Sequence, residues 1–447
     1  MSTTGTDPRE PDTAAPRPPA SPAGAARPAA EVRVLEPGEL RSAHTLFRAA
    51  LHGGGPADDE HWALTRLSYA PGRTFGVDLP AGTLAGTAMS FGSALTVPGG
   101  ARVPMAAVTR VGVRADRTRR GLLTGLMREQ LSDAADRGEI AATLRASEAR
   151  IYGRFGYGVA SRGRNLRVTA GARFRTGAPA GGEVRLLDPD EAATVLPPLY
   201  ARILAATARP GPIERDEGWW AHVLRSRRTA DEARGIAVHT GPRGDDGFAT
   251  WTVRQDGTDF GENVLELHDL HAATPQATAG LWRFLLRIDL LRAVSAHLRP
   301  LDEPVDLFLE DPRACRTTGV DDETWLRLLD VPAAFAARSW GESGGEPLRL
   351  RVHDALFPGN DGVHVIDGRA AGTNGAGPPD PSPAEDWPAD LECDVAGLAM
   401  AYLGDRRPSE LVASGWWTVH DGAAVARADR LFAATGPDTV PWCGTFF

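Results

Sequence analysis

The chain has 447 residues and a formal net charge of −9, and 42% of its residues are hydrophobic and 24% charged. This length and make-up indicate a globular protein of two or three domains. No block of basic residues stands out, which argues against a nucleic-acid-binding role, and no apolar run is long enough to span a bilayer. The start of the chain lacks a signal-peptide pattern, so we expect a cytoplasmic protein.

The first part of the chain predicts a tail followed by a small mixed region. Residues 1–30 are dominated by Pro, Ala, Ser and Thr and should be disordered. A strand is predicted over 32–35 and a helix over 40–47, where apolar residues recur at helical spacing. The loop LHGGGPADDEHW carries an acidic cluster, which indicates either a solvated loop or a cation-recognition site. The strand-like stretches RTFGVDL and GTLAGTAMSFGSALTV then predict an antiparallel meander.

The segment VTRVGVRADRTRRGLLTGLMREQLSDAADRG, residues 108–138, carries the clearest chemical signal. It predicts a strand, a basic turn and a helix that begins at Gly121. Free backbone N–H groups and the helix dipole converge at a helix N-terminus, so this turn, with Arg119 and Arg120 beside it, suits a diphosphate. A basic turn before an amphipathic helix is also often only a solvated cap, and this segment alone leaves both interpretations open.

The following strand, IAATLRASE, leads into ARIYGRFGYGVA, a turn of helix rich in glycine and aromatic residues. Its glycines lack the order, and the later acidic partner, of a dinucleotide-binding fingerprint, so we reject that interpretation.

These two segments together resemble the GNAT acyltransferase superfamily. More narrowly, VGVRADRTRRGLL, ASEARIYGRFGYG and a chain that ends in Phe are similar to the Eis (enhanced intracellular survival) family of N-acetyltransferases. The resemblance covers residues 31 to 447. It implies an α/β (α+β) fold in which two tandem GNAT-like mixed-sheet domains precede a sterol-carrier-protein-like C-terminal domain. We expect a tail at 1–30, an N-terminal acetyl-CoA-binding domain at 31–170, a second GNAT-like domain at 171–312, and a C-terminal domain carrying the catalytic C-terminus at 313–447.

The resemblance also implies acetyl-CoA as the co-substrate. Its contacts are expected along a strand backbone, at the basic turn with the helix start, and after the next strand: Val111, Gly112, Val113, Arg119, Arg120, Gly121, Leu122, Leu123, Thr124, Ser147 and Glu148. Thr118 stands where the superfamily has Arg or Gln and so removes a possible phosphate contact. Leu123 replaces a loop glycine, which is normal for the Eis family.

Acyl transfer from a thioester to an amine needs a proton donor for the departing thiolate. Tyr152 is the expected general acid, because the superfamily tyrosine precedes an aromatic–glycine pair, here Phe155–Gly156. Tyr157 is the competing candidate and is expected to pack in the core.

The chain ends on TVPWCGTFF, an apolar segment in a place where most chains are polar and frayed. In the Eis family the C-terminal carboxylate is the general base, and Phe447 occupies that position here. Trp442, Phe446 and Phe447 would anchor the tail. By itself the segment predicts only an aromatic end docked for stability.

The resemblance further implies a homohexamer that acetylates the amines of small cationic molecules, notably aminoglycosides at several positions. Two alternatives stay open: a non-catalytic lipid or small-molecule binding protein on a GNAT scaffold, and an acetyltransferase for protein or peptide lysines.

The rest of the chain carries weaker signals. The tryptophan pairs at 219–220 and 416–417 should divide between core and groove wall, and the segment 266–275 predicts a strand with a polar face. Helices are predicted over 277–294 and over 324–340, the second interrupted by Pro332. Linkers or loops are predicted at 169–184 and 368–390. The cysteines, Cys315, Cys393 and Cys443, are widely spaced and predict neither a disulfide framework nor a metal site.

Overall fold

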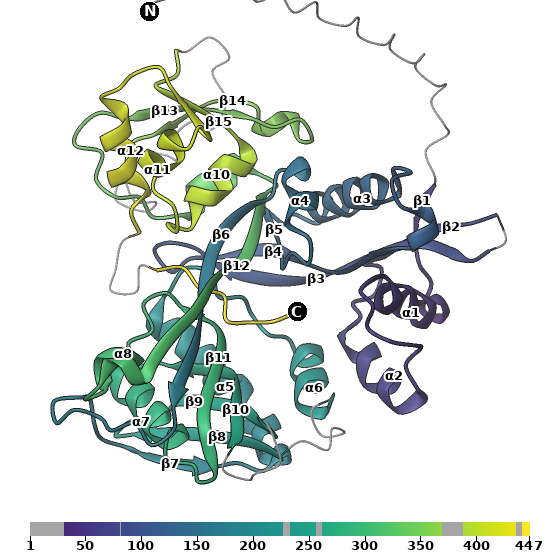
Figure 1. The fold of residues 1–447 in the computed structure, drawn as a ribbon. Helices are drawn as coiled ribbons and strands as arrows, with labels where there is room; N and C mark the ends of the chain where they lie inside the picture. Colours follow the sequence, from purple (N-terminus) through teal and green to yellow (C-terminus); the bar gives the residue numbers. More distant parts are fainter. Residues whose placement is uncertain (1–30, 81, 227–232, 256–261, 369–387, 435–439) are drawn as a thin grey trace, which may run out of the picture.

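The computed structural model describes residues 31–80, 82–226, 233–255, 262–368, 388–434 and 440–447. The tail predicted at 1–30 and most of the loop predicted at 368–390 lie outside these residues. The described chain forms an N-terminal region, a second region and a C-terminal region, and its C-terminus lies between the first two (Figure 1). No helix in the described ranges is both long and apolar enough to cross a membrane.

One twelve-stranded sheet runs through the first two regions in the order β1-β2-β3-β4-β5-β12-β6-β11-β10-β9-β8-β7. Its strands are β1 (Val32–Val34), β2 (Thr74–Asp78), β3 (Leu84–Thr96), β4 (Arg102–Val113), β5 (Ala141–Leu144), β6 (Gly158–Thr169), β7 (Glu183–Leu186), β8 (Ala233–Gly241), β9 (Gly244–Arg254), β10 (Asn263–Ala272), β11 (Leu291–Pro300) and β12 (Cys315–Leu328). The long strands β6 and β12 pair with each other and connect the two regions (Figure 1).

The strand pairing creates an opening in the N-terminal half of this sheet. Strands β2, β3 and β4 form the predicted antiparallel meander. Strand β4 then pairs with β5 in parallel, but only from Met105 opposite Ala141 to Ala107 opposite Thr143. Beyond these residues the backbone N–H and C=O groups of the two strands do not hydrogen-bond to each other. These groups are therefore available to a ligand.

Helices accompany the large sheet, and some of them pack directly on its strands. They are α1 (Leu40–Ala50), α2 (Asp59–Thr65), α3 (Leu122–Asp136), α4 (Ala149–Tyr152), α5 (Pro189–Thr207), α6 (Glu217–Ser226), α7 (Pro275–Leu285) and α8 (Val305–Phe308). Helix α3 buries Leu126, Met127 and Leu131, which recur at helical spacing and pack into the N-terminal core. The predicted strand at 32–35, the helix at 40–47 and the helix beginning at Gly121 are confirmed.

The C-terminal region has its own four-stranded sheet in the order β14-β13-β15-β16. It comprises α9 (Val331–Ala337), β13 (Leu348–His353), β14 (Gly362–Ile366), β15 (Leu391–Asp394), α10 (Val395–Tyr402), α11 (Pro408–Ala413), β16 (Trp417–Val419) and α12 (Ala424–Phe432). One buried cluster spans this region and the N-terminal region, since it includes both Leu398 of α10 and Met105 of β4. The two regions therefore share part of their apolar interior.

Two predicted helices are only partly confirmed, because each segment also contains a strand. The helix expected over 277–294 ends with α7 at Leu285, and β11 begins at Leu291. The segment expected to be helical over 324–340 begins as the end of β12, where Thr324 to Leu328 are all buried. A strand buried on both faces has no polar alternation, so its sequence resembles that of a buried helix. Pro332 does not interrupt a helix; it occupies the first turn of α9, where proline is favoured.

Candidate active site

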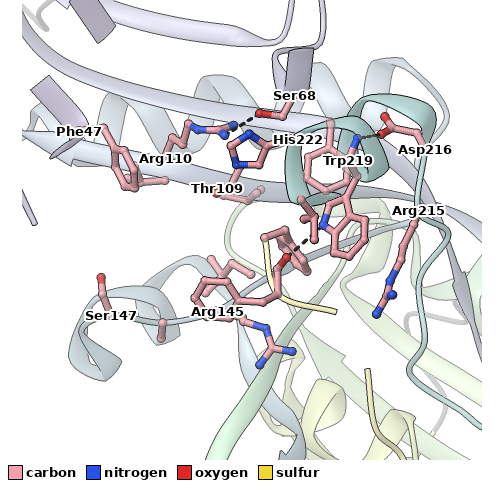
Figure 2. Close-up of a pocket in the computed structure, with 18 of the residues that line it drawn as sticks. Phe47, Ser68, Thr109, Arg110, Arg145, Ser147, Arg215, Asp216, Trp219 and His222 are labelled. Atoms are coloured by element: carbon pink, nitrogen blue, oxygen red, sulfur yellow. Dashed lines mark hydrogen bonds between the residues drawn. The ribbon is translucent and has the colours of Figure 1, made fainter. Parts of the chain in front are cut away.

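A cavity of about 480 Å³ lies where β4 and β5 separate. One wall is formed by β4 residues 108–111 and by residues 144–147 at and after the end of β5. The opposite wall comes from the second region, through Arg215 just before α6 and Trp219 in its first turn (Figure 2). Asp269 on β10 also lines it. The C-terminal tail contributes Phe446 and Phe447, so three parts of the chain that are distant in sequence build one cavity.

Tyr152 and Ser147 enter the cavity from the segment after β5. Tyr152 ends α4 and is only 6% exposed, and burial raises the pKa of its hydroxyl to about 12. Tyr157 packs edge-on against Tyr152 with ring centroids 6.0 Å apart, but it does not line the cavity. Its fully enclosed hydroxyl has no hydrogen-bond partner among the described residues, and burial raises its pKa further. Of the two tyrosines, only Tyr152 is placed to reach a ligand in the cavity.

Phe447 lies in the same cavity as Tyr152. Its ring is half-buried and meets the ring of Phe91 on β3 edge-on, with centroids 5.6 Å apart. Phe446 does not anchor the tail as predicted, because its side chain is 74% exposed. Its backbone carbonyl instead accepts a hydrogen bond from the indole N–H of Trp219 at 3.1 Å (Figure 2).

Glu323 of β12 holds the tail from one side. This carboxylate is buried and accepts hydrogen bonds from the backbone N–H groups of Cys443, at 3.0 Å, and Gly444, at 2.9 Å. It also pairs with Arg145 at 3.1 Å, and Arg145 donates to the carbonyl of Thr445 at 2.8 Å. A buried acid that accepts several hydrogen bonds fixes the groups that donate to it.

Arg215 holds the tail from the other side. Its guanidinium donates to the Thr445 hydroxyl and to the Gly444 carbonyl, both at 3.0 Å. It is fully buried between the rings of Tyr200 and Trp219 and is paired with Asp269 at 2.5 Å. Burial opposes ionisation of Asp269, but the Arg215 guanidinium holds the pKa of that carboxyl well below its usual range.

The turn before α3 has the features of an anion site. Gly121 is the N-cap residue with φ +83°, and no side chain caps the first-turn N–H groups of α3. Arg119 and Arg120 are exposed, and neither forms an ion pair within the described ranges. The hydroxyl of Thr118 donates to the Ala115 carbonyl at 3.3 Å and so closes the preceding turn. These free donors and charges fit a diphosphate.

The other predicted cofactor contacts divide between the turn and the cavity. Val111 and Ser147 line the cavity, whereas Gly112 and Val113 continue along β4 towards the turn. Gly112 also allows α1 to approach β4, because a Cβ there would lie 3.1 Å from the Cα of Phe47. Glu148 is the N-cap of α4 and accepts a hydrogen bond from the N–H of Arg150 at 3.3 Å. Helix α3 begins with the remaining three contacts: Leu122, Leu123 and Thr124.

Several cavity residues were not predicted as site residues. Arg145 and Arg215 line the cavity, and Glu323 pairs with Arg145. No local motif marks these residues, because Arg215 lies between two acids and Glu323 follows two aspartates, as in an ordinary charged loop. His268 and Asp269 lie in the segment that was predicted as a strand with a polar face, and both line the cavity because β10 is irregular between Leu267 and Asp269. No group of three or more metal-ligating side chains is found in the residues that the structure describes.

The tryptophan pair at 219–220 divides as predicted. Trp219 forms part of the cavity wall, and Trp220 packs in the core of the second region. The acidic cluster at 58–60 has a structural role, since Asp58 caps α2 by accepting from the N–H of His61 at 2.7 Å.

Known proteins share this organisation over most of the chain. Family models described as acetyltransferase (GNAT) domain match residues 31–160 and 211–328, and one described as sterol carrier protein domain matches residues 331–444. An uncharacterized N-acetyltransferase of Streptomyces coelicolor is 36% identical over 423 residues, which is 92% of this chain and 98% of that protein. N-acetyltransferase Eis of Mycobacterium tuberculosis is 34% identical over 80% of this chain and 85% of its own length.

A solved structure agrees with these matches. The crystal structure of Eis1 from Mycobacterium abscessus resembles the fold with a TM-score of 0.76 and 33% identity, over 93% of this chain and 100% of that one. The predicted fold class, two GNAT domains followed by a sterol-carrier-protein-like domain, is confirmed.

Proposed function

The chain belongs to the Eis family of GNAT N-acetyltransferases, and on this premise we propose that it acetylates the amine of a small cationic molecule, with Tyr152 as general acid and the Phe447 α-carboxylate as general base. The observation that carries the proposal is that both residues line one cavity at the separation of β4 and β5. The family resemblance adds aminoglycosides as candidate acceptors, a homohexameric assembly and a cytoplasmic location to the proposal.

Acetyl-CoA would lie along the opening between β4 and β5. Its diphosphate would bind the first-turn N–H groups of α3 and the exposed charges of Arg119 and Arg120, which have no acidic partner among the described residues. Its pantetheine arm would follow the backbone of Val111 to Val113 towards Ser147 and Glu148. The thioester would then reach the cavity beside Tyr152.

In the proposed reaction the neutral amine attacks the thioester carbonyl, a C–N bond forms, and the C–S bond breaks to release the CoA thiolate. With a pKa of about 12, the Tyr152 hydroxyl stays protonated at physiological pH, so it donates a hydrogen bond or its proton to the thiolate. The Phe447 carboxylate attracts and orients the ammonium form of the acceptor and receives the proton that the amine loses, directly or through water.

The position of the terminal carboxylate tests this mechanism directly. Adding one glycine after Phe447 moves the carboxylate away from its place, whereas Phe447→Leu keeps it there. We expect the extended protein to lose at least roughly 100-fold in kcat and the Phe447→Leu protein to lose far less, in a thiol-release assay with aminoglycosides, polyamines and lysine peptides as acceptors. Full activity of the extended protein would exclude the carboxylate as base.

The same assay separates the remaining alternatives. A non-catalytic binding protein would release no thiol with any acceptor, and acetyl-CoA would not raise its melting temperature. An acetyltransferase for protein lysines would prefer the peptides over the small amines.

A further inference from the structure

Arg110 of β4 differs from the other two arginines that line the cavity. Arg145 is paired with Glu323, and Arg215 is paired with Asp269. Arg110 forms no ion pair within the described part of the chain.

The partners of Arg110 are all uncharged. Its guanidinium donates to the Ser68 hydroxyl at 2.7 Å and to the Met89 sulfur at 3.1 Å, and its Cζ lies 4.6 Å from the centre of the Tyr69 ring. Burial lowers the pKa of Arg110, as expected for a cation without a counter-ion. A desolvated charge without a counter-ion is costly to the folded protein, and a bound anion would reduce this cost.

The backbone at Arg110 is also unusual. Its φ of +50° is rare for a residue with a side chain. The register of β3 and β4 shifts at this point, because Thr87 pairs with Gly112 but Met89 pairs with Thr109. This bulge puts consecutive β4 residues on the cavity wall, and such irregularities concentrate at functional sites.

The groups around Arg110 include two histidines. His222 lines the same cavity as Arg110 (Figure 2). Buried His44 lies behind this wall, and burial together with the charges of Arg110, His61, Arg48 and His222 lowers its pKa to about 4. Arg110 thus puts a positive charge on the cavity wall without an acidic partner among the described residues, and Phe447, the residue that carries the α-carboxylate, lines the same cavity.

We propose that Arg110 binds a carboxylate that the acceptor carries in addition to its amine, so that the preferred acceptor is a small zwitterion such as an amino acid. This inference rests on the proposed acetyltransferase function and replaces the small cation of that proposal by a zwitterion as the preferred acceptor. A guanidinium matches a carboxylate with two parallel hydrogen bonds, and the Phe447 carboxylate attracts the ammonium of the same molecule. A volume of about 480 Å³ suits such a molecule.

The test compares ω-amino acids with the matching ω-amino amides, which differ only in the charge of the group that Arg110 would bind. Thiol release by the wild-type protein should give a kcat/KM roughly 10- to 100-fold higher for the best acid than for its amide. Arg110→Gln should lower kcat/KM for the acid to the level of the amide. The kcat/KM for the amide and the KM for acetyl-CoA should stay unchanged. Arg173→Gln, at an exposed arginine paired with Glu310, is the matched control.

Each outcome has a defined meaning. Equal use of acids and amides by the wild-type protein, or equal loss for both in Arg110→Gln, would overturn the role of Arg110 while leaving the acetyltransferase intact. No thiol release with any acceptor would instead refute the proposed function. Because Arg110→Gln could fold poorly, the melting temperature of the wild-type protein is also measured with each ligand, and only the acids should raise it clearly.

Discussion

Tyr152 and Tyr157 are neighbouring buried tyrosines whose hydroxyl groups face different surroundings. The Tyr152 side chain borders the cavity, whereas the Tyr157 hydroxyl is enclosed without a partner in the described structure. A buried hydroxyl without a hydrogen bond destabilises the folded state. Removal of the hydroxyl should therefore lower activity at Tyr152 and stabilise the folded protein at Tyr157.

We predict that Tyr152→Phe lowers kcat by roughly 100-fold with little change in the KM for acetyl-CoA, because it removes the donor to the departing thiolate. Tyr157→Phe should keep kcat and raise the free energy of unfolding by about 1 kcal/mol. Steady-state kinetics and thermal unfolding of both variants measure these effects. If Tyr157→Phe lost activity and Tyr152→Phe kept it, the assignment of the general acid would have to be reversed.

His44 offers a prediction about pH. Burial, followed by neighbouring cations, lowers its pKa from 6.5 to about 4, and its ring nitrogens have no hydrogen-bond partner within the described residues. The unfolded chain then binds more protons than the folded protein between these two values, so stability is retained above about pH 6.5 and falls as the pH drops towards 4. Phe does not titrate, and its ring can pack against Trp62 and Tyr69 as His44 does. His44→Phe should therefore reduce the loss of unfolding free energy over this pH range by about 2–3 kcal/mol.

Denaturant unfolding of wild-type protein and His44→Phe at several pH values from 7 to about 4 measures the difference. The exposed His297, changed to Phe, serves as control and should leave the pH dependence as in the wild type. Parallel stability curves for wild type and His44→Phe would show that His44 is not a neutral buried group.

At the scale of elements, α3 carries glycines with left-handed backbone at both ends. Gly121 precedes the helix with φ +83°, and Gly138 follows it with φ +77°. A Cβ at either position would meet no described atom within 4 Å, so alanine would be strained by the backbone alone. Only Gly121 lies at the proposed diphosphate site.

Gly121→Ala and Gly138→Ala should each lower the free energy of unfolding by about 1–2 kcal/mol. Only Gly121→Ala should also raise the KM for acetyl-CoA, by roughly 10-fold, because its Cβ would occupy space where the diphosphate approaches the backbone. Calorimetric titration with acetyl-CoA provides a direct check. An equal effect of both variants on affinity would place the diphosphate elsewhere.

The elements predicted best from the sequence are those that bury only one face. Helix α3 packs one face on the sheet, so its apolar residues keep a clear period, and its glycine-bounded ends are visible in the sequence. The end of β12 is buried on both faces, and the segment after α7 switches to β11 through Leu290, which has φ +61°. In both places the tertiary environment decides the structure, and local patterning is uninformative.

At the scale of the whole molecule, the candidate site exists only because distant parts of the chain meet. Tyr152 lies in the segment ASEARIYGRFGYG, which the resemblance to the family identifies as a motif. Glu323, Arg145 and Arg215 hold the tail, and they come from β12, from the position after β5 and from the loop before α6. Nothing in the spacing of these charges along the sequence indicates that they converge, because their proximity follows from the strand order of the large sheet.

Glu323 connects several of these parts directly, since it receives hydrogen bonds from Ser161 on β6, from Arg145 and from the tail N–H groups of Cys443 and Gly444. Glu323→Gln keeps the shape but removes the charge and turns one acceptor into a donor. We predict a loss of about 2–4 kcal/mol in the free energy of unfolding and a fall in kcat of roughly 10- to 100-fold, with the KM for acetyl-CoA little changed.

Digestion with a carboxypeptidase distinguishes displacement of the tail from general destabilisation. In the wild-type protein the hydrogen bonds to Thr445 and Phe446 should protect Phe447, whereas Glu323→Gln should release it quickly at a temperature where both proteins remain folded. Glu310→Gln, at an exposed ion pair, should behave as the wild type. Should Glu323→Gln lose activity while Phe447 stays protected, Glu323 would act on the cavity by a route other than the tail, and the position of the terminal carboxylate would not depend on it.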